Sequence, residues 1–171
     1  MNLFLLRHGI AVERGIPGYS RDSDRPLTPK GERRLANIAD AMEAMGLTFD
    51  LILSSPYVRA RQTAEIVTDA LGLKQKLEFS EALTPDGDAK TLIAELNKLG
   101  PEPGNVLLVG HEPFLSALVS LLTTGEPRRH SQAEFIALTN ADDPRSGAAA
   151  KSGARHPRVA LAASPFAARK K

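Results

Sequence analysis

The stretch NLFLLRHG at residues 2–9 places a short apolar run directly before an arginine, a histidine and a glycine. An apolar run of this length, bounded by polar residues and glycine, is typical of a buried β-strand. Two other short runs, at residues 51–53 and 106–109, end in the same way. They are followed by Ser54, Ser55 and Pro56 and by Gly110, His111 and Glu112. Three predicted strands therefore end in residues capable of chemistry.

Segments with helical periodicity separate the predicted strands. The first helix is expected to begin at Pro29, with Thr28 as its N-cap, and to stop at Gly46. Three more helices are predicted over residues 56–71, 88–99 and 113–122, and further strands over residues 76–79, 135–139 and 159–162. This alternation predicts an α/β domain with a largely parallel sheet.

Length and composition predict one globular domain over residues 1–171, which we expect to be a monomer. The chain has no cysteine, which excludes disulfides, thiolate zinc sites and cysteine nucleophiles and favours a reducing, cytoplasmic location. The N-terminal apolar run is too short for a signal peptide or a membrane span. We therefore expect neither export nor a membrane partner.

Basic charge is concentrated near the C-terminus. Residues 141–171 hold seven lysines or arginines against two aspartates, a net charge of +5. Within this segment, residues 142–157 are rich in alanine, proline, serine and glycine, and we expect a flexible basic loop there. Because no aromatic residues are interleaved with the charges, no nucleic-acid partner is expected.

The ends of the predicted strands are expected to form one cleft. In open α/β sheets ligands bind at the carboxyl ends of the strands, which would bring together His8, His111 and residues 54–59. Guanidinium groups bind phosphate bidentately and stay charged at physiological pH. The arginines available to this cleft are Arg7, Arg25, Arg59 and, as an alternative, Arg61. The cleft is therefore expected to bind an anion, with phosphate favoured.

Several other chemistries lack their sequence signatures. The chain contains no P-loop, no dinucleotide-binding glycine motif, no nucleophile elbow and no zincin motif. A neutral histidine in a phosphate site can instead attack phosphorus and form a covalent phosphohistidine. Surrounding cations stabilise charge on the transferring oxygens, so neither a metal nor a cofactor is expected.

Four ordered motifs resemble the histidine phosphatase superfamily. They are Arg7-His8-Gly9, Leu27-Thr28-Pro29-Lys30-Gly31, Ser55-Pro56 with Arg59-Ala60 and Gln62-Thr63-Ala64, and Gly110-His111-Glu112-Pro113. The segments Arg25-Pro26-Leu27-Thr28 and Thr84-Pro85-Asp86-Gly87-Asp88 are similar to the SixA-type phosphohistidine phosphatases within it. The resemblance extends from residue 1 to about residue 125. It implies a phosphoglycerate mutase-like, three-layer α/β/α fold whose mostly parallel central sheet is flanked by helices.

The resemblance also implies roles for single residues. It makes His8 the nucleophile, and it implies a phosphate pocket formed by Arg7, Arg25, Arg59 and His111. Substrate contacts are further expected at Gly9, where the backbone can pass close to a ligand, and at Ser55 and Glu112.

Two of the arginines have neighbours that could take their place. Arg21 lies four residues before Arg25 in the same loop. Arg59 and Arg61 are two residues apart, so they point to different faces of the helix, and we prefer Arg59 for the cleft. Arg61 is then expected to pair with Glu65 at i+4.

Other polar residues near the cleft have structural interpretations. Ser54 and Ser55 are expected to cap the second helix rather than to act as nucleophiles. Glu112 orients a substrate or favours the start of the following helix. The general acid of larger family members has no clear equivalent here, which leaves Glu81, Asp86 and Asp88 as candidates.

The leading hypothesis is a metal-independent phosphatase that removes phosphate from phosphohistidine on a signalling protein through a phosphorylated His8. Protonated imidazole is a good leaving group, so the missing acid matters less for this substrate than for an alkyl ester. The alternatives are a small-molecule phosphatase of the same superfamily and a module that binds a phosphorylated protein without turnover.

Overall fold

The computed structural model describes residues 1–100, 103–124, 135–139 and 158–160. Its strands are β1 (Asn2–Arg7), β2 (Leu51–Ser54), β3 (Leu77–Phe79), β4 (Asn105–Gly110), β5 (Phe135–Thr139) and β6 (Arg158–Ala160). Its α-helices are α1 (Pro29–Ala44), α2 (Val58–Ala70), α3 (Ala89–Lys98) and α4 (Phe114–Thr124). Three 3-10 turns complete the described elements: η1 (Asp22–Asp24), η2 (Lys74–Lys76) and η3 (Glu81–Leu83). The expected flexible loop at residues 142–157 lies outside the described residues.

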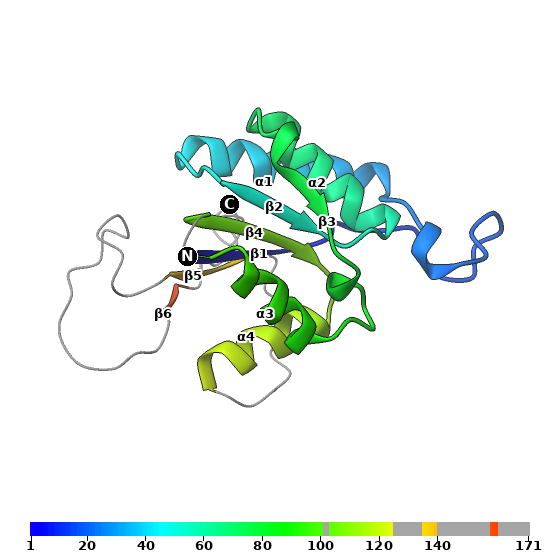
Figure 1. Cartoon of the computed structure of the whole chain (residues 1–171). Coiled ribbons are helices and arrows are strands. Elements are labelled where there is room, and N and C mark those ends of the chain that lie inside the picture. Colours follow the sequence, from blue (N-terminus) through cyan, green and yellow to red (C-terminus); the bar gives the residue numbers. More distant parts are fainter. Residues whose placement is uncertain (101–102, 125–134, 140–157, 161–171) are drawn as a thin grey trace, which may run out of the picture.

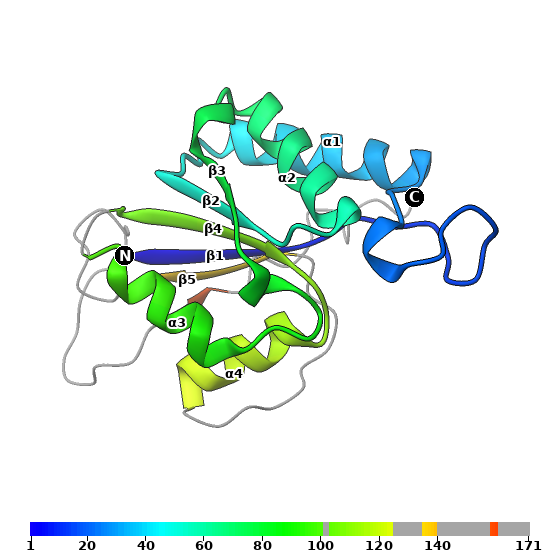
Figure 2. The same cartoon turned by 45° about the vertical axis from the view of Figure 1, so that its right-hand side comes forward.

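One mixed sheet organises these elements, with strand order β3-β2-β4-β1-β5-β6. The first four strands of this order are parallel, and β5 is antiparallel to both of its neighbours. Helices α1 and α2 cover one face of the sheet, and α3 and α4 cover the other (Figures 1 and 2). The structure thus confirms the predicted three-layer α/β/α fold with a mostly parallel sheet.

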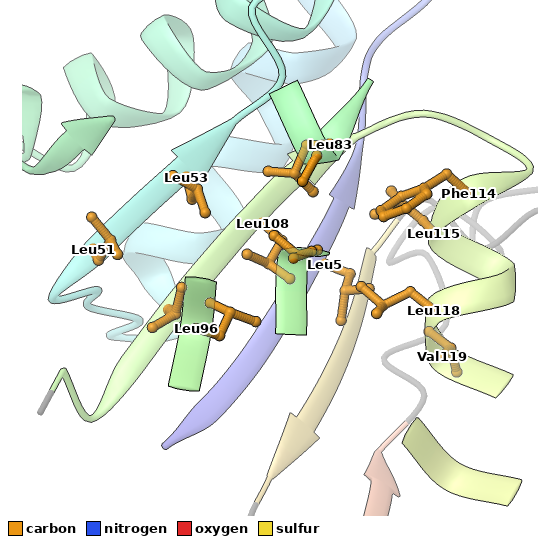
Figure 3. Packing of buried hydrophobic residues seen from close by; sticks show 13 residues of the cluster. Leu5, Leu51, Leu53, Leu83, Leu96, Leu108, Phe114, Leu115, Leu118 and Val119 are labelled. Carbon is orange, nitrogen blue, oxygen red and sulfur yellow. The ribbon is translucent and has the colours of Figure 1, made fainter. Parts of the chain in front are cut away.

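Alternation along the strands divides the buried apolar residues into two clusters. Phe4 and Leu6 of β1 pack on the side of α1 and α2, whereas Leu5 packs on the side of α3 and α4. Leu108 of β4 joins Leu5 in the second cluster, together with Leu118 of α4 (Figure 3). Both faces of the central strands are buried, which is why these strands are almost uniformly apolar.

The predicted limits of α1 are confirmed. The Thr28 hydroxyl accepts a hydrogen bond from the backbone N–H of Gly31 at 3.0 Å, as an N-cap does. At the other end, Gly46 adopts a φ of +66°, a left-handed conformation that glycine adopts without strain. Among the described helices, none is long and apolar enough to cross a membrane.

The predicted start of α2 is wrong by two residues, and the predicted cap is absent. The helix begins at Val58, and its N-cap residue Tyr57 makes no side-chain capping bond. Sheet pairing explains the delay, because the N–H of Ser55 still donates to the carbonyl of Val109 at 2.9 Å. Ser54 does not cap the helix either, since its hydroxyl donates to the carbonyl of Ser55.

Parallel pairing brings the ends of β1, β2 and β4 to one edge of the sheet. Arg7 of β1 lies opposite Gly110 of β4, and the N–H of His8 donates to the Gly110 carbonyl at 3.0 Å. Ser54 of β2 lies opposite Val109 of β4. The residues that follow these three strands therefore leave the sheet as neighbours.

The first turn of α1 packs closely against the chain that follows β1. The carbonyl of Ile10 accepts a hydrogen bond from the N–H of Thr28, and it lies where a side chain at Gly31 would point. An added Cβ at Gly31 would clash with this backbone oxygen, which cannot move aside as a flexible side chain can. Only glycine lets the helix begin this close to the end of β1.

We predict that Gly31→Ala lowers the free energy of unfolding by about 1–2 kcal/mol, because overpacking against backbone outweighs the better helix propensity of alanine. Urea unfolding followed by circular dichroism measures the change. Asn37→Ala, at an exposed position of the same helix, is the control and should shift the free energy by less than about 0.5 kcal/mol. Equal unfolding midpoints for Gly31→Ala and the wild type would contradict the packing argument.

Candidate active site

A pocket opens at the edge of the sheet where β1 and β4 end. His8 and His111 line it, together with five arginines: Arg7, Arg14, Arg25, Arg34 and Arg59. Among the described residues that line this pocket, Glu112 is the only carboxylate. The lining residues come from the end of β1 and the segment that follows it, from α1 and α2, from the segment between β3 and α3, and from the chain just after β4. They form one strongly cationic cavity at the strand ends, where the sequence predicts a cleft.

The hydrogen bonds of His8 fix the position of its proton. Its Nδ1 lies 2.8 Å from the carbonyl oxygen of Gly9, and a carbonyl can only accept, so Nδ1 carries the hydrogen. The other ring nitrogen, Nε2, accepts a hydrogen bond from Nε of Arg59 at 3.2 Å. The lone pair of a neutral imidazole is therefore held on Nε2, beside a guanidinium group.

Burial and charge keep His8 in its neutral form. Burial lowers its pKa from 6.5 to about 4; the hydrogen bond to Gly9 opposes this shift, and the positive charges of Arg59, Arg7 and Arg25 add to it. The pKa of His8 is lowered because its protonated form is disfavoured. A buried imidazolium would lose its hydration and would be repelled by the arginines.

His111 packs beside His8, with 4.8 Å between the ring centroids, and is only 1% exposed. Its Nε2 lies 2.9 Å from the hydroxyl oxygen of Ser55. The same oxygen accepts a hydrogen bond from the N–H of Tyr57. Its Nδ1 is buried and has no hydrogen-bond partner within the described part of the chain. Burial, followed by the charges of His8 and Arg59, lowers the pKa of His111 to about 2.

Arg59 reaches the pocket from the first turn of α2 and is almost fully buried. While its Nε faces His8, its two terminal nitrogens donate to Asp22, one to the backbone carbonyl at 2.6 Å and one to the carboxylate at 2.8 Å. Arg61 is exposed and lies 3.7 Å from Glu65, so the predicted surface pair is present. The preference for Arg59 over Arg61 agrees with this geometry.

Arg25 lines the pocket, and its Nε and one terminal nitrogen donate to the carboxylate of Asp22 at 3.0 and 2.7 Å. Arg21 is exposed, pairs with Asp24 and does not line the pocket. The pattern of arginines indicated this loop, but sequence reasoning missed Asp22. Its spacing of three residues before Arg25 could have indicated it, because such a pair can meet when the chain between the two residues forms a helical turn.

The other predicted substrate contacts have different positions. Gly9 lines the pocket, and its N–H donates to the Thr63 hydroxyl at 3.1 Å. Glu112 also lines it, whereas Ser55 lies behind His111 and is not among the lining residues. The start of α2 at Val58 moves its first N–H groups two residues further along the chain than predicted.

The three candidate proton donors lie away from the pocket lining. Asp88 caps α3 by accepting from the N–H of Thr91 at 2.8 Å, and this bond holds the pKa of its carboxyl below the usual value. Glu81 and Asp86 are exposed on the segment between β3 and α3. From this segment it is Pro85 that lines the pocket.

Known proteins are similar to this chain in sequence. Residues 3–84 match the histidine phosphatase superfamily (branch 1). The phosphohistidine phosphatase SixA of Escherichia coli (strain K12) is 33% identical over 148 residues, which cover 86% of this chain and 89% of that protein. An uncharacterised protein of Picosynechococcus is 39% identical over 153 residues, 87% of each chain.

Solved structures give the same result. The protein histidine phosphatase SixA complexed with tungstate has a TM-score of 0.71 at 33% identity, covering 82% of this chain and 88% of that one. Phosphoglycerate mutase from Bacillus anthracis shares the fold, with a TM-score of 0.61 at 17% identity over 81% of this chain and 88% of that one. With its arginine-lined pocket and paired histidines, the chain belongs to the histidine phosphatase superfamily and is a phosphatase.

Proposed function

We propose that the protein removes the phosphoryl group from phosphohistidine on a signalling protein, through a covalent intermediate on His8 and without a metal. The observation that carries this proposal is the neutral His8, whose Nε2 lone pair faces the arginine-lined pocket. The 33% identity to a phosphohistidine phosphatase over most of both chains supports the substrate class.

In the proposed reaction, Nε2 of His8 attacks the phosphorus atom, and the bond from phosphorus to the substrate imidazole breaks. The departing imidazole, protonated on its other nitrogen, leaves as a neutral ring. Water then attacks phosphorus and releases inorganic phosphate, and Nε2 regains its lone pair. When the phosphoryl group binds, the Nε–H of Arg59 exchanges its acceptor, from Nε2 of His8 to a phosphoryl oxygen, while the bonds from its terminal nitrogens to Asp22 keep the guanidinium group in place.

The groups around His8 suit the charge that develops on the phosphoryl oxygens. Permanent positive charge comes from Arg7, Arg25 and Arg59. It would stabilise the negative charge on the phosphoryl oxygens, as a metal ion does in metal-dependent phosphoryl transfer. The Ser55 hydroxyl can donate to Nε2 of His111, which places the proton of that ring on Nδ1. The buried, unpartnered Nδ1–H would then donate to a phosphoryl oxygen.

A protein substrate agrees with the short chain, which leaves little room for the insertions that enclose a small substrate. The related SixA structure is complexed with tungstate, a tetrahedral oxyanion, and we place the transferred phosphoryl group in the arginine-lined pocket here. We further propose that the protein is a cytoplasmic monomer, and the absence of cysteine from its sequence suits a reducing compartment.

The proposal predicts rapid phosphate release from a phosphohistidine protein that is unchanged by EDTA. His8→Ala should lower the rate by roughly 10³-fold or more, because the covalent route is lost. Phosphate release from a phosphohistidine protein, a phosphoserine peptide and a small phosphate ester is measured side by side, with Arg61→Ala as the variant expected to keep full activity.

Four results would contradict this proposal in different ways. Unchanged hydrolysis by His8→Ala would exclude the covalent mechanism, and loss of activity with EDTA would exclude metal independence. Equal turnover of the esters would indicate a small-molecule phosphatase. Binding of the phosphoprotein without release would indicate a binding module.

The neutral state of His8 predicts how its ring responds to pH. Since the pKa of His8 is lowered to about 4, its ring should stay neutral around pH 5.5, where a free histidine is mostly protonated. Nitrogen-15 NMR of the imidazole rings, assigned with His8→Asn, measures this titration. A midpoint near 6.5 would contradict the argument from burial.

The same shift predicts the direction of acid destabilisation. The unfolded chain takes up protons at His8 and His111 below pH 6.5, whereas the folded chain does not until much lower pH. The stability from keeping these rings neutral is therefore complete above pH 6.5 and is lost as the pH falls towards 4 for His8 and towards 2 for His111. Replacement of both histidines should flatten this part of the curve of unfolding free energy against pH.

The position of Glu112 makes it the candidate proton donor for substrates with poor leaving groups. Glu112→Gln should lower turnover of an alkyl phosphate by roughly 10²-fold and that of phosphohistidine by less than about threefold, because imidazole carries its own proton. Asp86→Asn, which alters an exposed carboxylate outside the pocket, is the matched control. Equal losses on both substrates would assign Glu112 to binding instead.

A further inference from the structure

One carboxylate, that of Asp22, accepts hydrogen bonds from three of the arginines that line the pocket. Oδ1 of Asp22 accepts from Nε of Arg14 at 2.8 Å and from Arg25 at 2.7 and 3.0 Å, and Oδ2 accepts from Arg59 at 2.8 Å. Asp22 itself is not among the lining residues of the pocket. It therefore contacts the arginines from outside the space that a ligand would occupy.

The bonds to Asp22 set the orientation of Arg59. A guanidinium group is planar, so fixing its two terminal nitrogens also fixes the direction of its Nε–H. Asp22 fixes both, one through its backbone carbonyl and one through its carboxylate, and Nε then faces His8. The geometry at the nucleophile thus depends on a residue that does not touch it.

Arg25 is held in the same manner. Its Nε and one terminal nitrogen donate to Oδ1 of Asp22, and its remaining terminal nitrogen donates to the carbonyl of Val12. The side chain of Arg25 is only 12% exposed, and that of Arg59 only 3%. Two buried cations with few alternative partners need a counter-charge, because each would otherwise repel the other.

The electrostatics of Asp22 agree with this arrangement. Burial alone would raise its pKa, but hydrogen bonds from Arg25 and Arg14 and the charge of Arg59 hold the pKa well below its usual range. The carboxylate is therefore ionised at every pH at which the pocket could work. Its partners stay paired with it before any phosphate arrives.

We propose that Asp22 is a positioning residue that holds Arg59 and Arg25 in the orientation that binds a phosphoryl group. The inference rests on the proposed function, since it assumes that the pocket takes phosphate. Prior ordering of the arginines reduces the entropy lost when an anion binds, and this gain outweighs the repulsion between the anion and a carboxylate on the far side of the guanidinium groups.

Asp24 provides a matched control on the same 3-10 turn. It also pairs with an arginine, but its partner Arg21 is exposed and lies outside the pocket lining. Asp22→Asn and Asp24→Asn thus remove the same charge two residues apart and differ in which arginine they release. The carbonyl bond from Asp22 to Arg59 remains possible in Asp22→Asn, which limits the change to the carboxylate.

The test is calorimetric titration of the full-length protein with inorganic phosphate. We expect Asp22→Asn to raise the Kd for phosphate about tenfold, because two arginine side chains must then be ordered by the ligand. The KM for the phosphohistidine protein should rise by a similar factor. Asp24→Asn should keep the wild-type Kd and KM, and Asp22→Glu, which retains the carboxylate, should recover part of the affinity.

The outcomes separate this inference from its alternatives. A purely structural role would lower the thermal midpoint and the active fraction of Asp22→Asn while leaving Kd and KM unchanged, which would overturn the inference. Tighter phosphate binding by Asp22→Asn would also overturn it, because Asp22 would then compete with the ligand. Failure of the wild type to bind phosphate would instead overturn the proposed function.

Discussion

Parallel pairing between β1 and β4 holds the two histidines of the pocket together. The ladder continues past the last residue of β1, where the N–H of His8 donates to the Gly110 carbonyl. His8 and His111 follow paired residues, so their rings meet at a centroid distance of 4.8 Å although about a hundred residues separate them. These backbone hydrogen bonds belong to the central ladder of the sheet. The position of the two histidines is therefore as stable as the core of the sheet.

Electrostatic balance governs the rest of the pocket. Several arginines converge on a neutral imidazole, and the cost of bringing the cations together is offset by one carboxylate that contacts three of them. Burial, with the arginines adding to it, disfavours protonation of His8, so the charge that attracts an anion also helps to keep this imidazole neutral. The same positive charges thus suit the pocket to an anion and favour the neutral form of His8.

Much of the architecture was predictable from local patterns. Apolar runs, the Thr28 cap and the glycines after the helices gave the order of the elements, and the strand ends indicated where a cleft would form. The start of α2 was predicted two residues early, because the chain after β2 continues to pair with β4 before it coils. A periodic pattern does not carry that information, since it depends on a neighbouring strand.

The sequence by itself determined the element order, the fold class and the type of residue at each strand end, because these follow from apolar periodicity and from residues next to one another in the chain. Only the tertiary structure decided which polar side chains meet when they lie far apart in the chain. Asp22 meets Arg59 across 37 positions, and Ser55 meets His111 across 56. It also placed Glu112 in the pocket and Glu81, Asp86 and Asp88 outside it. Side-chain partners far apart in sequence are set by packing of the layers, and no local pattern encodes that packing.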